Sequence, residues 1–563
     1  MSLNFISSNI IEEREGLIMR AVRKFILVFS VLMILGIVLA TFPQDSQAIP
    51  PFARKYKTAC TTCHWSSFPK LNAFGRAYLA NGLRMPGGAD EVFVKDEPVA
   101  MGASAWSRLF PKKAVWPGDM PGMPPIGLSF SSEYKWTRER PLDPMGADDP
   151  GSPERAPDTY FNGINEVQLL SGGTLGETLS WFSVITLWEN PGFGHSTVDV
   201  HRAYFNYSPF IFGEQGLVNF RFGKIEPRAV PMSNHRRQLR TTMYLMNNFP
   251  AIPVGNFFGF SPNQQGVEIW GSMNGPGGKG GFQWAAGIVN GQPGMAIHIF
   301  NDTATGMTQE IADHVHERNE GRGAFDVNNG KDWYVTASYK IGGMGVHGEE
   351  SVDDSLVAKE NWQDDQLTIK GYYYQGTTGA WVDSPDGSTT GNAFFQSGMM
   401  GADPNGGDAM WDRDANRFKR FGVVLDANWW NFNFIGAASF FRDDLKGTTT
   451  YPMMAAMGMP REQGDKFETD IYTAEVQYVL FPWLIPSYRL ENVNPSFDAR
   501  DVKSFNRHSF DIAILARANM KVLIGGSFTE RPDSRSGVGG IQIATPDMPP
   551  LDDTFRIGVD IDF

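Results

Sequence analysis

Long stretches of the chain beyond residue 125 alternate between apolar and polar positions. The last ten residues show this most clearly, because every second position is apolar, namely Phe555, Ile557, Val559, Ile561 and Phe563. Residues 472–480 repeat the alternation. A period of two predicts β-strands with one apolar face. That face would point to a core in a soluble sandwich, or to lipid in a transmembrane barrel.

Connection lengths favour the barrel. We predict strands near residues 126–137, 161–171, 177–189, 198–208, 216–225, 264–273, 281–290, 331–341, 366–376, 417–429, 432–443, 468–480, 484–493, 504–517, 520–530 and 554–563. Long links mostly alternate with short ones, as extracellular loops and periplasmic turns do in bacterial barrels. Soluble domains rarely contain such long loops. We therefore predict an all-β fold, in which residues 126–563 form a transmembrane antiparallel β-barrel of about sixteen strands.

Three details qualify this prediction. The link at residues 342–365 should be a short turn but is long and charged, so a hidden extra strand pair is an alternative there. The terminal Phe563 on an alternating strand resembles the outer-membrane insertion signal. Tryptophans near strand ends fit interfacial girdles, although scattered core aromatics would look similar: Trp136, Trp188, Trp270, Trp333, Trp429 and Trp483.

The N-terminus predicts export. Arg20, Arg23 and Lys24 precede an apolar run over residues 25–40, and a small-residue cleavage site ends at Ala48. We expect residues 1–48 to be a cleaved signal peptide, with Met19 as a more natural start than the first methionine. The alternative is an uncleaved membrane anchor, although the run is short for a span. Either arrangement exports the rest of the chain.

Composition limits the function classes. The net charge is −13 and the apolar fraction is 42%, which indicates neither disorder nor a polytopic helical membrane protein. No basic face or tail is visible, so we expect no nucleic-acid partner.

The two cysteines of the chain lie in Cys60-Thr61-Thr62-Cys63-His64. C-x-x-C-H is the pattern in which two thiols attach to the vinyl groups of a haem and the adjacent histidine ligates the iron. A disulfide is an alternative, and so is half of a zinc site, but no second cysteine pair completes four zinc ligands. We predict one covalent haem c, bound by Cys60 and Cys63, with His64 as proximal ligand.

Residues 69–80 predict a short helix whose apolar face, Leu71, Phe74, Tyr78 and Leu79, would cover one side of the haem. Gly82 is the expected C-terminal stop. Met85 follows and is the candidate distal ligand, since a thioether raises the potential of the iron. Packing of Met85 against the ring edge, a histidine from later in the chain and an open site are the alternatives.

These features divide the chain after the signal peptide. We expect residues 49–90 to form a small monohaem cytochrome c domain with α-helices, too small for a core of its own. Residues 91–125 are rich in Pro, Gly and Met and are predicted to be a linker. The porin-like barrel would follow.

The N-terminal segment contains Phe52-Ala53-Arg54, Cys60-x-x-Cys63-His64, Pro69-x-Leu71-Asn72-x-Phe74-Gly75 and Asn81-Gly82. These motifs resemble those of the outer-membrane monohaem fused cytochrome–porins, best known as iron(II) oxidases. Over the barrel the resemblance is architectural. It implies a cytochrome domain at or within the barrel mouth. Cys60, Cys63 and His64 carry over as haem residues, whereas the distal ligand does not.

The resemblance implies an enzyme, an Fe(II):cytochrome c oxidoreductase in the outer membrane. It would oxidise extracellular Fe(II) and pass the electron through the barrel to a periplasmic cytochrome c or copper protein. No acid–base catalytic residue is required, because the protein supplies position and redox tuning. The same haem could serve another donor or acceptor, and a diffusion porin with a cytochrome plug is a separate alternative.

Two long loops carry secondary candidates. In sixteen-stranded porins the loop corresponding to residues 226–263 folds inward, so Arg236 and Arg237 could pair with haem propionates and His235 could be a distal ligand. An external basic loop or ordinary lumen lining is the alternative. Residues 313–317 read Asp-His-Val-His-Glu and would either bind a first-row metal or form a solvated loop. Acidic pairs such as Asp364-Asp365 and Asp443-Asp444 would draw cations or only solubilise.

Overall fold

The computed structural model describes residues 51–56, 58, 60–65, 70–85, 99–100, 119–120, 126–138, 158–175, 178–189, 199–212, 214–233, 244–247, 260, 264–291, 330–348, 362–383, 409–444, 466–497, 504–517, 519–530 and 553–562. The predicted signal peptide lies outside these ranges. Within the predicted linker, only β1 (Val99–Ala100) and β2 (Asp119–Met120) are described, and they pair antiparallel. None of the described helices is long and apolar enough to cross a bilayer.

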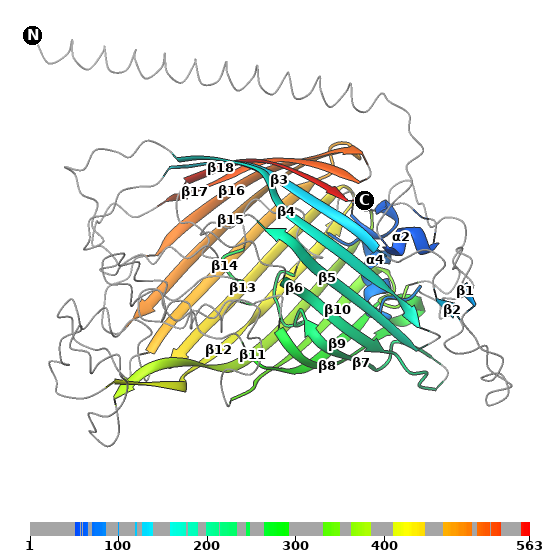
Figure 1. Cartoon of the computed structure of the whole chain (residues 1–563), viewed down its shortest axis with the longest axis horizontal. Coiled ribbons are helices and arrows are strands. Elements are labelled where there is room, and N and C mark those ends of the chain that lie inside the picture. Colours follow the sequence, from blue (N-terminus) through cyan, green and yellow to red (C-terminus); the bar gives the residue numbers. More distant parts are fainter. Residues whose placement is uncertain are drawn as a thin grey trace, which may run out of the picture.

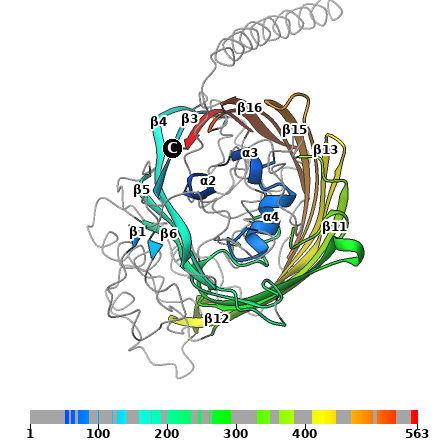
Figure 2. The same cartoon turned by 90° about the vertical axis from the view of Figure 1, so that its right-hand side faces the viewer.

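The described strands that follow the linker close into one antiparallel barrel (Figures 1 and 2). They are β3 (Ile126–Arg138), β4 (Asp158–Leu175), β5 (Leu179–Glu189), β6 (Asp199–Tyr207), β7 (Asn219–Ile225), β8 (Gln264–Asn274), β9 (Lys279–Val289), β10 (Asp332–Met344), β11 (Gln366–Asp383), β12 (Ala409–Trp429), β13 (Phe432–Asp444), β14 (Lys466–Tyr478), β15 (Leu484–Phe497), β16 (Phe505–Arg517), β17 (Met520–Glu530) and β18 (Asp553–Asp562). The sixteen-stranded barrel is confirmed. Because β10 pairs directly with β11, no extra strand pair is inserted in the barrel at residues 342–365.

The barrel is polar inside and apolar outside. On β7, Phe220 and Phe222 are 43% and 50% exposed, whereas Asn219 and Arg221, which alternate with them, are 0% and 6% exposed. On β14 the predicted polar positions are buried and Tyr472 is exposed. A closed barrel with this inversion faces lipid outside and a polar lumen inside. The soluble-sandwich alternative is therefore wrong.

The prediction that Trp270 belongs to an interfacial girdle is wrong. Trp270 is only 2% exposed and its Nε1 donates to the Ala80 carbonyl at 3.0 Å, so its side chain lies in the lumen. Trp333 and Trp429 are exposed on the outer surface, as a girdle requires. The sequence places Trp270 near a strand end, but the face it occupies depends on the register of β8.

The N-terminal segment forms three short helices, α2 (Pro51–Tyr56), α3 (Cys60–Cys63) and α4 (Ala73–Ala80). Helix α4 begins later than predicted, because Asn72 is its N-cap and accepts a hydrogen bond from the Gly75 amide at 2.9 Å. Leu71 lies before the helix in a bridge with His64. Gly82 follows the helix with φ +71°, and the Leu83 amide donates to the Tyr78 carbonyl, which confirms the expected stop.

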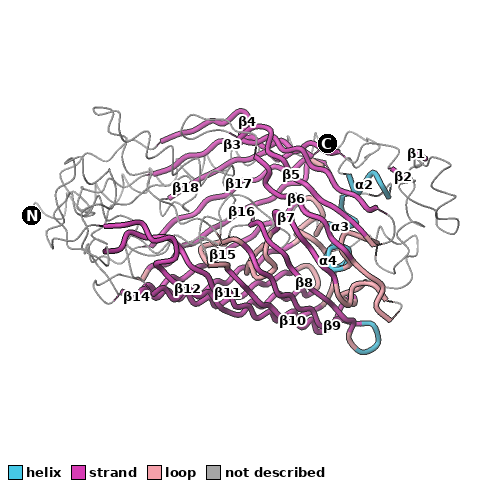
Figure 3. Tube along the Cα trace, turned by 60° about the horizontal axis from the view of Figure 1, so that its bottom comes forward, coloured by secondary structure: helices cyan, strands magenta, loops and turns pink. Residues whose placement is uncertain are grey.

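These helices lie inside the barrel at the end where the short turns are (Figures 2 and 3). Their partners are spread around the wall. Lys55 Nζ donates to Thr174 on β4 at 2.6 Å, and Arg76 pairs with Asp426 on β12 at 3.1 Å. Further partners in the strands and in the link between β10 and β11 include Leu179, Trp270, His347, Trp362, Asn433 and Gln477. The segment therefore plugs the lumen at this end, and we call residues 51–85 the plug.

The link between β7 and β8 folds inward, as predicted, over the residues that are described. Tyr244 Oη donates to Glu475 on β14 and the Leu245 amide donates to Glu491 on β15, both at 2.7 Å. In the closed strand order β15 lies opposite β7, so this loop crosses the lumen. Phe260 then packs against three rings from two strands, Tyr372 and Tyr374 of β11 and Phe441 of β13.

Candidate functional site

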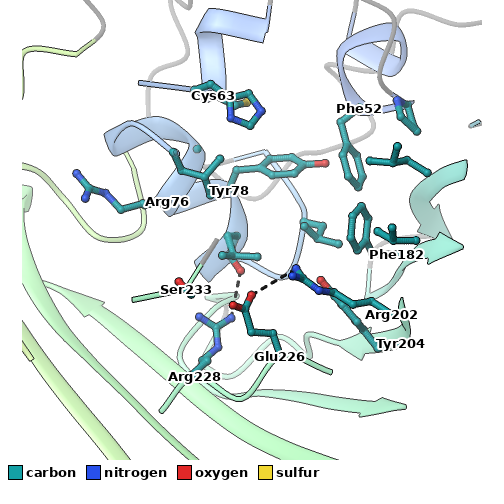
Figure 4. Close-up of a pocket in the computed structure, with 18 of the residues that line it drawn as sticks. Phe52, Cys63, Arg76, Tyr78, Phe182, Arg202, Tyr204, Glu226, Arg228 and Ser233 are labelled. Carbon is teal, nitrogen blue, oxygen red and sulfur yellow. Dashed lines mark hydrogen bonds and ion pairs between the residues drawn. The ribbon is translucent and has the colours of Figure 1, made fainter. Parts of the chain in front are cut away.

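A cavity of about 440 Å³ lies between the plug and the lumen wall (Figure 4). This volume is within the usual range for small-molecule and cofactor sites, roughly 300–1,000 Å³. Cys60, Cys63, His64 and Met85 all line it. The structure thus brings four of the predicted site residues to one cavity.

Cys60 and Cys63 are not joined to each other by a disulfide. Burial raises the pKa of Cys60 to about 11, with a further contribution from the Asp562 carboxylate. Burial raises the pKa of Cys63 to about 12, and Cys60 adds to this shift.

Backbone hydrogen bonds fix the cysteine turn against α4. The His64 amide donates to the Cys60 carbonyl at 3.0 Å, and the Asn72 amide donates to the Cys63 carbonyl at 3.0 Å. Asn72 Nδ2 also donates to the Thr62 carbonyl at 2.9 Å. A Cβ at Gly75 would lie 2.1 Å from Cys63 O, so only glycine allows this close approach. The motif residues Asn72 and Gly75 therefore hold the cysteine turn in place.

Met85 is 2% exposed and lines the same cavity as His64. The turn after α4 directs the chain back toward the cavity, because Gly82 and Leu83 both have positive φ. His201 on β6 also lines the cavity. Both a methionine and a later histidine thus remain available as a second axial ligand.

Aromatic and apolar side chains form much of the cavity wall. The face predicted from α4, Leu71, Phe74, Tyr78 and Leu79, lines it. The Phe52 ring lies 5.5 Å from Tyr78 and 6.0 Å from Phe182 of β5, measured between ring centroids. Such a wall excludes water from a bound planar ligand and lowers the local dielectric.

Figure 4 shows a charged group on the side of the cavity away from Cys63. Arg202 Nη1 lies 3.3 Å from Glu226. Arg221 and Arg228 pair with Glu268 at 2.7 and 3.1 Å. We call these five residues the arginine floor. Sequence reasoning missed them, although each strand member occupies a polar position among apolar ones.

The other predicted residues lie either outside the described residues or elsewhere in the barrel. Arg236, Arg237 and His235 lie outside the described residues, as does the segment 313–317. Asp364 pairs with Lys340 at 2.6 Å and Asp443 with Arg420 at 2.8 Å, so these acids hold the barrel together rather than solubilise it. Among the described residues, no group of three or more His, Cys, Asp or Glu could hold a metal ion.

The donor set of the cavity fits a c-type haem. It contains two thiols at the attachment spacing, an imidazole beside them and a buried thioether. The apolar wall suits the porphyrin faces, and the arginine floor suits carboxylates.

No family model and no curated protein matches the chain. Several solved structures are similar over 78% of it. OmpT, an outer-membrane protein of Vibrio cholerae, is 9% identical over 96% of its own length, with a TM-score of 0.40. An anion-selective porin from Comamonas acidovorans is 9% identical over 98%, with a TM-score of 0.41. OprB of Pseudomonas putida is 10% identical over 94%, with a TM-score of 0.42.

Proposed function

We propose that this chain is an outer-membrane c-type cytochrome that oxidises extracellular Fe(II) and passes the electron to a periplasmic cytochrome c or copper protein. One observation carries the proposal: Cys60, Cys63, His64 and Met85 line a single cavity inside a lipid-facing barrel. A haem bound there would supply one-electron chemistry, and a thioether ligand would favour its reduced form.

The chain's own residues have three tasks in this function. Cys60 and Cys63 tether the cofactor, and His64 holds its iron. The plug and the inward loop keep the site within the lumen, which provides a path across an apolar band of roughly 25 Å. The cavity lies at the short-turn end, the periplasmic end in barrels of this kind, so a periplasmic acceptor would meet it at close range.

A diffusion porin with a plug is the second candidate. A closed sixteen-stranded barrel taken alone fits this function better than iron oxidation, because passage through the lumen is what such barrels provide. Against it, the plug and the inward loop both occupy the lumen over the described residues. A third candidate keeps the haem but has a donor or acceptor other than iron.

Rapid mixing discriminates among the three. Oxidised protein in detergent is mixed with Fe(II), and the haem absorbance bands are followed. We expect reduction, and we expect none with a Cys60→Ser, Cys63→Ser protein. Covalent haem that no Fe(II) concentration reduces at any pH would refute iron oxidation. A steady ion conductance in planar bilayers from a protein without haem would support the porin.

A further inference from the structure

We propose that Arg202 and Arg228 bind the propionate carboxylates of the haem, which rests on the proposed function. In a porphyrin of the haem b type, the two vinyl groups and the two propionates lie at opposite edges. Once Cys60 and Cys63 hold the vinyl edge, the propionates must point away from them. Figure 4 shows that Arg202 and Arg228 lie across the cavity from Cys63, with Tyr78 between.

The two guanidinium groups have donors left for a ligand. Arg202 is 18% exposed and pairs with Glu226 at 3.3 Å. Arg228 is 22% exposed, and its Nε pairs with Glu268 at 3.1 Å. Its Nη2 makes a contact of 3.5 Å with the Leu79 carbonyl. Both side chains line the cavity, and guanidinium matches a carboxylate with two parallel hydrogen bonds.

Glu268 alone cannot neutralise the positive charge of the arginines in the floor. Its side chain is fully buried and accepts from Arg221, Arg228 and Tyr334 at 2.6 to 3.1 Å. The floor holds three arginines and two glutamates, so its formal net charge is +1. Burial lowers the pKa of Arg228, although Glu268 opposes this effect. An anion in the cavity would stabilise these cations, because buried charges need partners.

The test measures the midpoint potential of the haem by optical titration in the intact protein. Arg228→Gln and Arg202→Gln remove one positive charge next to the ring. At a fixed electrode potential the ratio of reduced to oxidised haem should fall about tenfold, which corresponds to about 59 mV for one electron. Arg228→Lys should retain most of the potential.

Arg442→Gln is the matched control. Arg442 is 28% exposed, pairs with Asp470 at 2.8 Å and does not line the cavity, so the same loss of charge should leave the potential unchanged. The pH dependence gives a second readout. A propionate without its arginine has a higher pKa, so the potential of Arg228→Gln should gain pH dependence near neutrality.

The outcomes separate this inference from the proposed function. If the haem is covalently bound and Arg228→Gln, Arg202→Gln and Arg442→Gln all keep the wild-type midpoint potential, the propionate assignment alone is overturned. Protein without covalent haem overturns both. A lower potential in the two floor variants, with partial recovery in Arg228→Lys, supports the assignment.

Discussion

The contact between α4 and the cysteine turn gives the sharpest prediction. In Gly75→Ala the new Cβ would lie 2.1 Å from Cys63 O, and real contacts of this kind essentially never fall below 3.0 Å. Helix α4 or the turn must therefore move by about 1 Å, which costs roughly 1–3 kcal/mol for overpacking. Because the plug has no core of its own, this cost should appear as easier local opening of the plug.

Limited trypsin digestion of the solubilised protein measures that opening. Cleavage after Lys70 and Arg76, which lie in the plug, should become about 5- to 150-fold faster in Gly75→Ala. Gly371→Ala is the matched control, because a Cβ there meets no atom within 4 Å. If both variants are cleaved at the wild-type rate, the tight packing of α4 on the cysteine turn is not what stabilises the plug.

Three further predictions follow from single contacts. Tyr244→Phe removes the hydrogen bond to Glu475, and the free energy with which the inward loop docks on the wall should fall by about 1–3 kcal/mol. More frequent openings in the ion current across planar bilayers would show this, and an unchanged current would contradict it. Burial lowers the pKa of His347 below its ordinary value of 6.5, although its hydrogen bond to the Ser272 carbonyl opposes this. The unfolded form then binds more protons, so plug docking should weaken as pH falls below about 6.5, measured by trypsin cleavage, and His347→Gln should lose this dependence. Cys63→Ser should leave one vinyl group unattached and shift the pyridine haemochrome band to longer wavelength; an unshifted band would contradict attachment at Cys63.

The barrel was predictable because its strands carry a strict period of two. Every predicted strand in residues 126–563 matches one in the structure, and the polar face of β14 is buried as a lumen face should be. Strand ends were less predictable. Strand β12 begins at Ala409 rather than near 417, because its first residues pair with the extended end of β11, for example Trp411 with Trp381. Backbone hydrogen bonds to the neighbouring strand stabilise this segment, although it shows no apolar alternation.

The cavity was predictable only in part. The spacing of Cys60, Cys63 and His64 is visible in the sequence. The position of the plug at the barrel mouth was expected from the family resemblance alone, because no residue pattern specifies it. The start of α4 was missed because the apolar period extends back to Leu71, whereas the helix begins only after Asn72, whose side chain caps it by accepting from the Gly75 amide. Arg202 was missed because alternation predicts the lumen face of a strand but not the depth of a residue along it, and Arg228 was missed because it lies in the link after β7, where no strand alternation applies.

The most direct test of the central claim is the absorbance spectrum of the purified oxidised protein before and after anaerobic addition of Fe(II). The account predicts the bands of a covalently bound haem, and their conversion to the reduced form as Fe(II) is oxidised. A protein that carries no haem and has Cys60 joined to Cys63 would contradict it, and so would a haem whose bands never change with Fe(II).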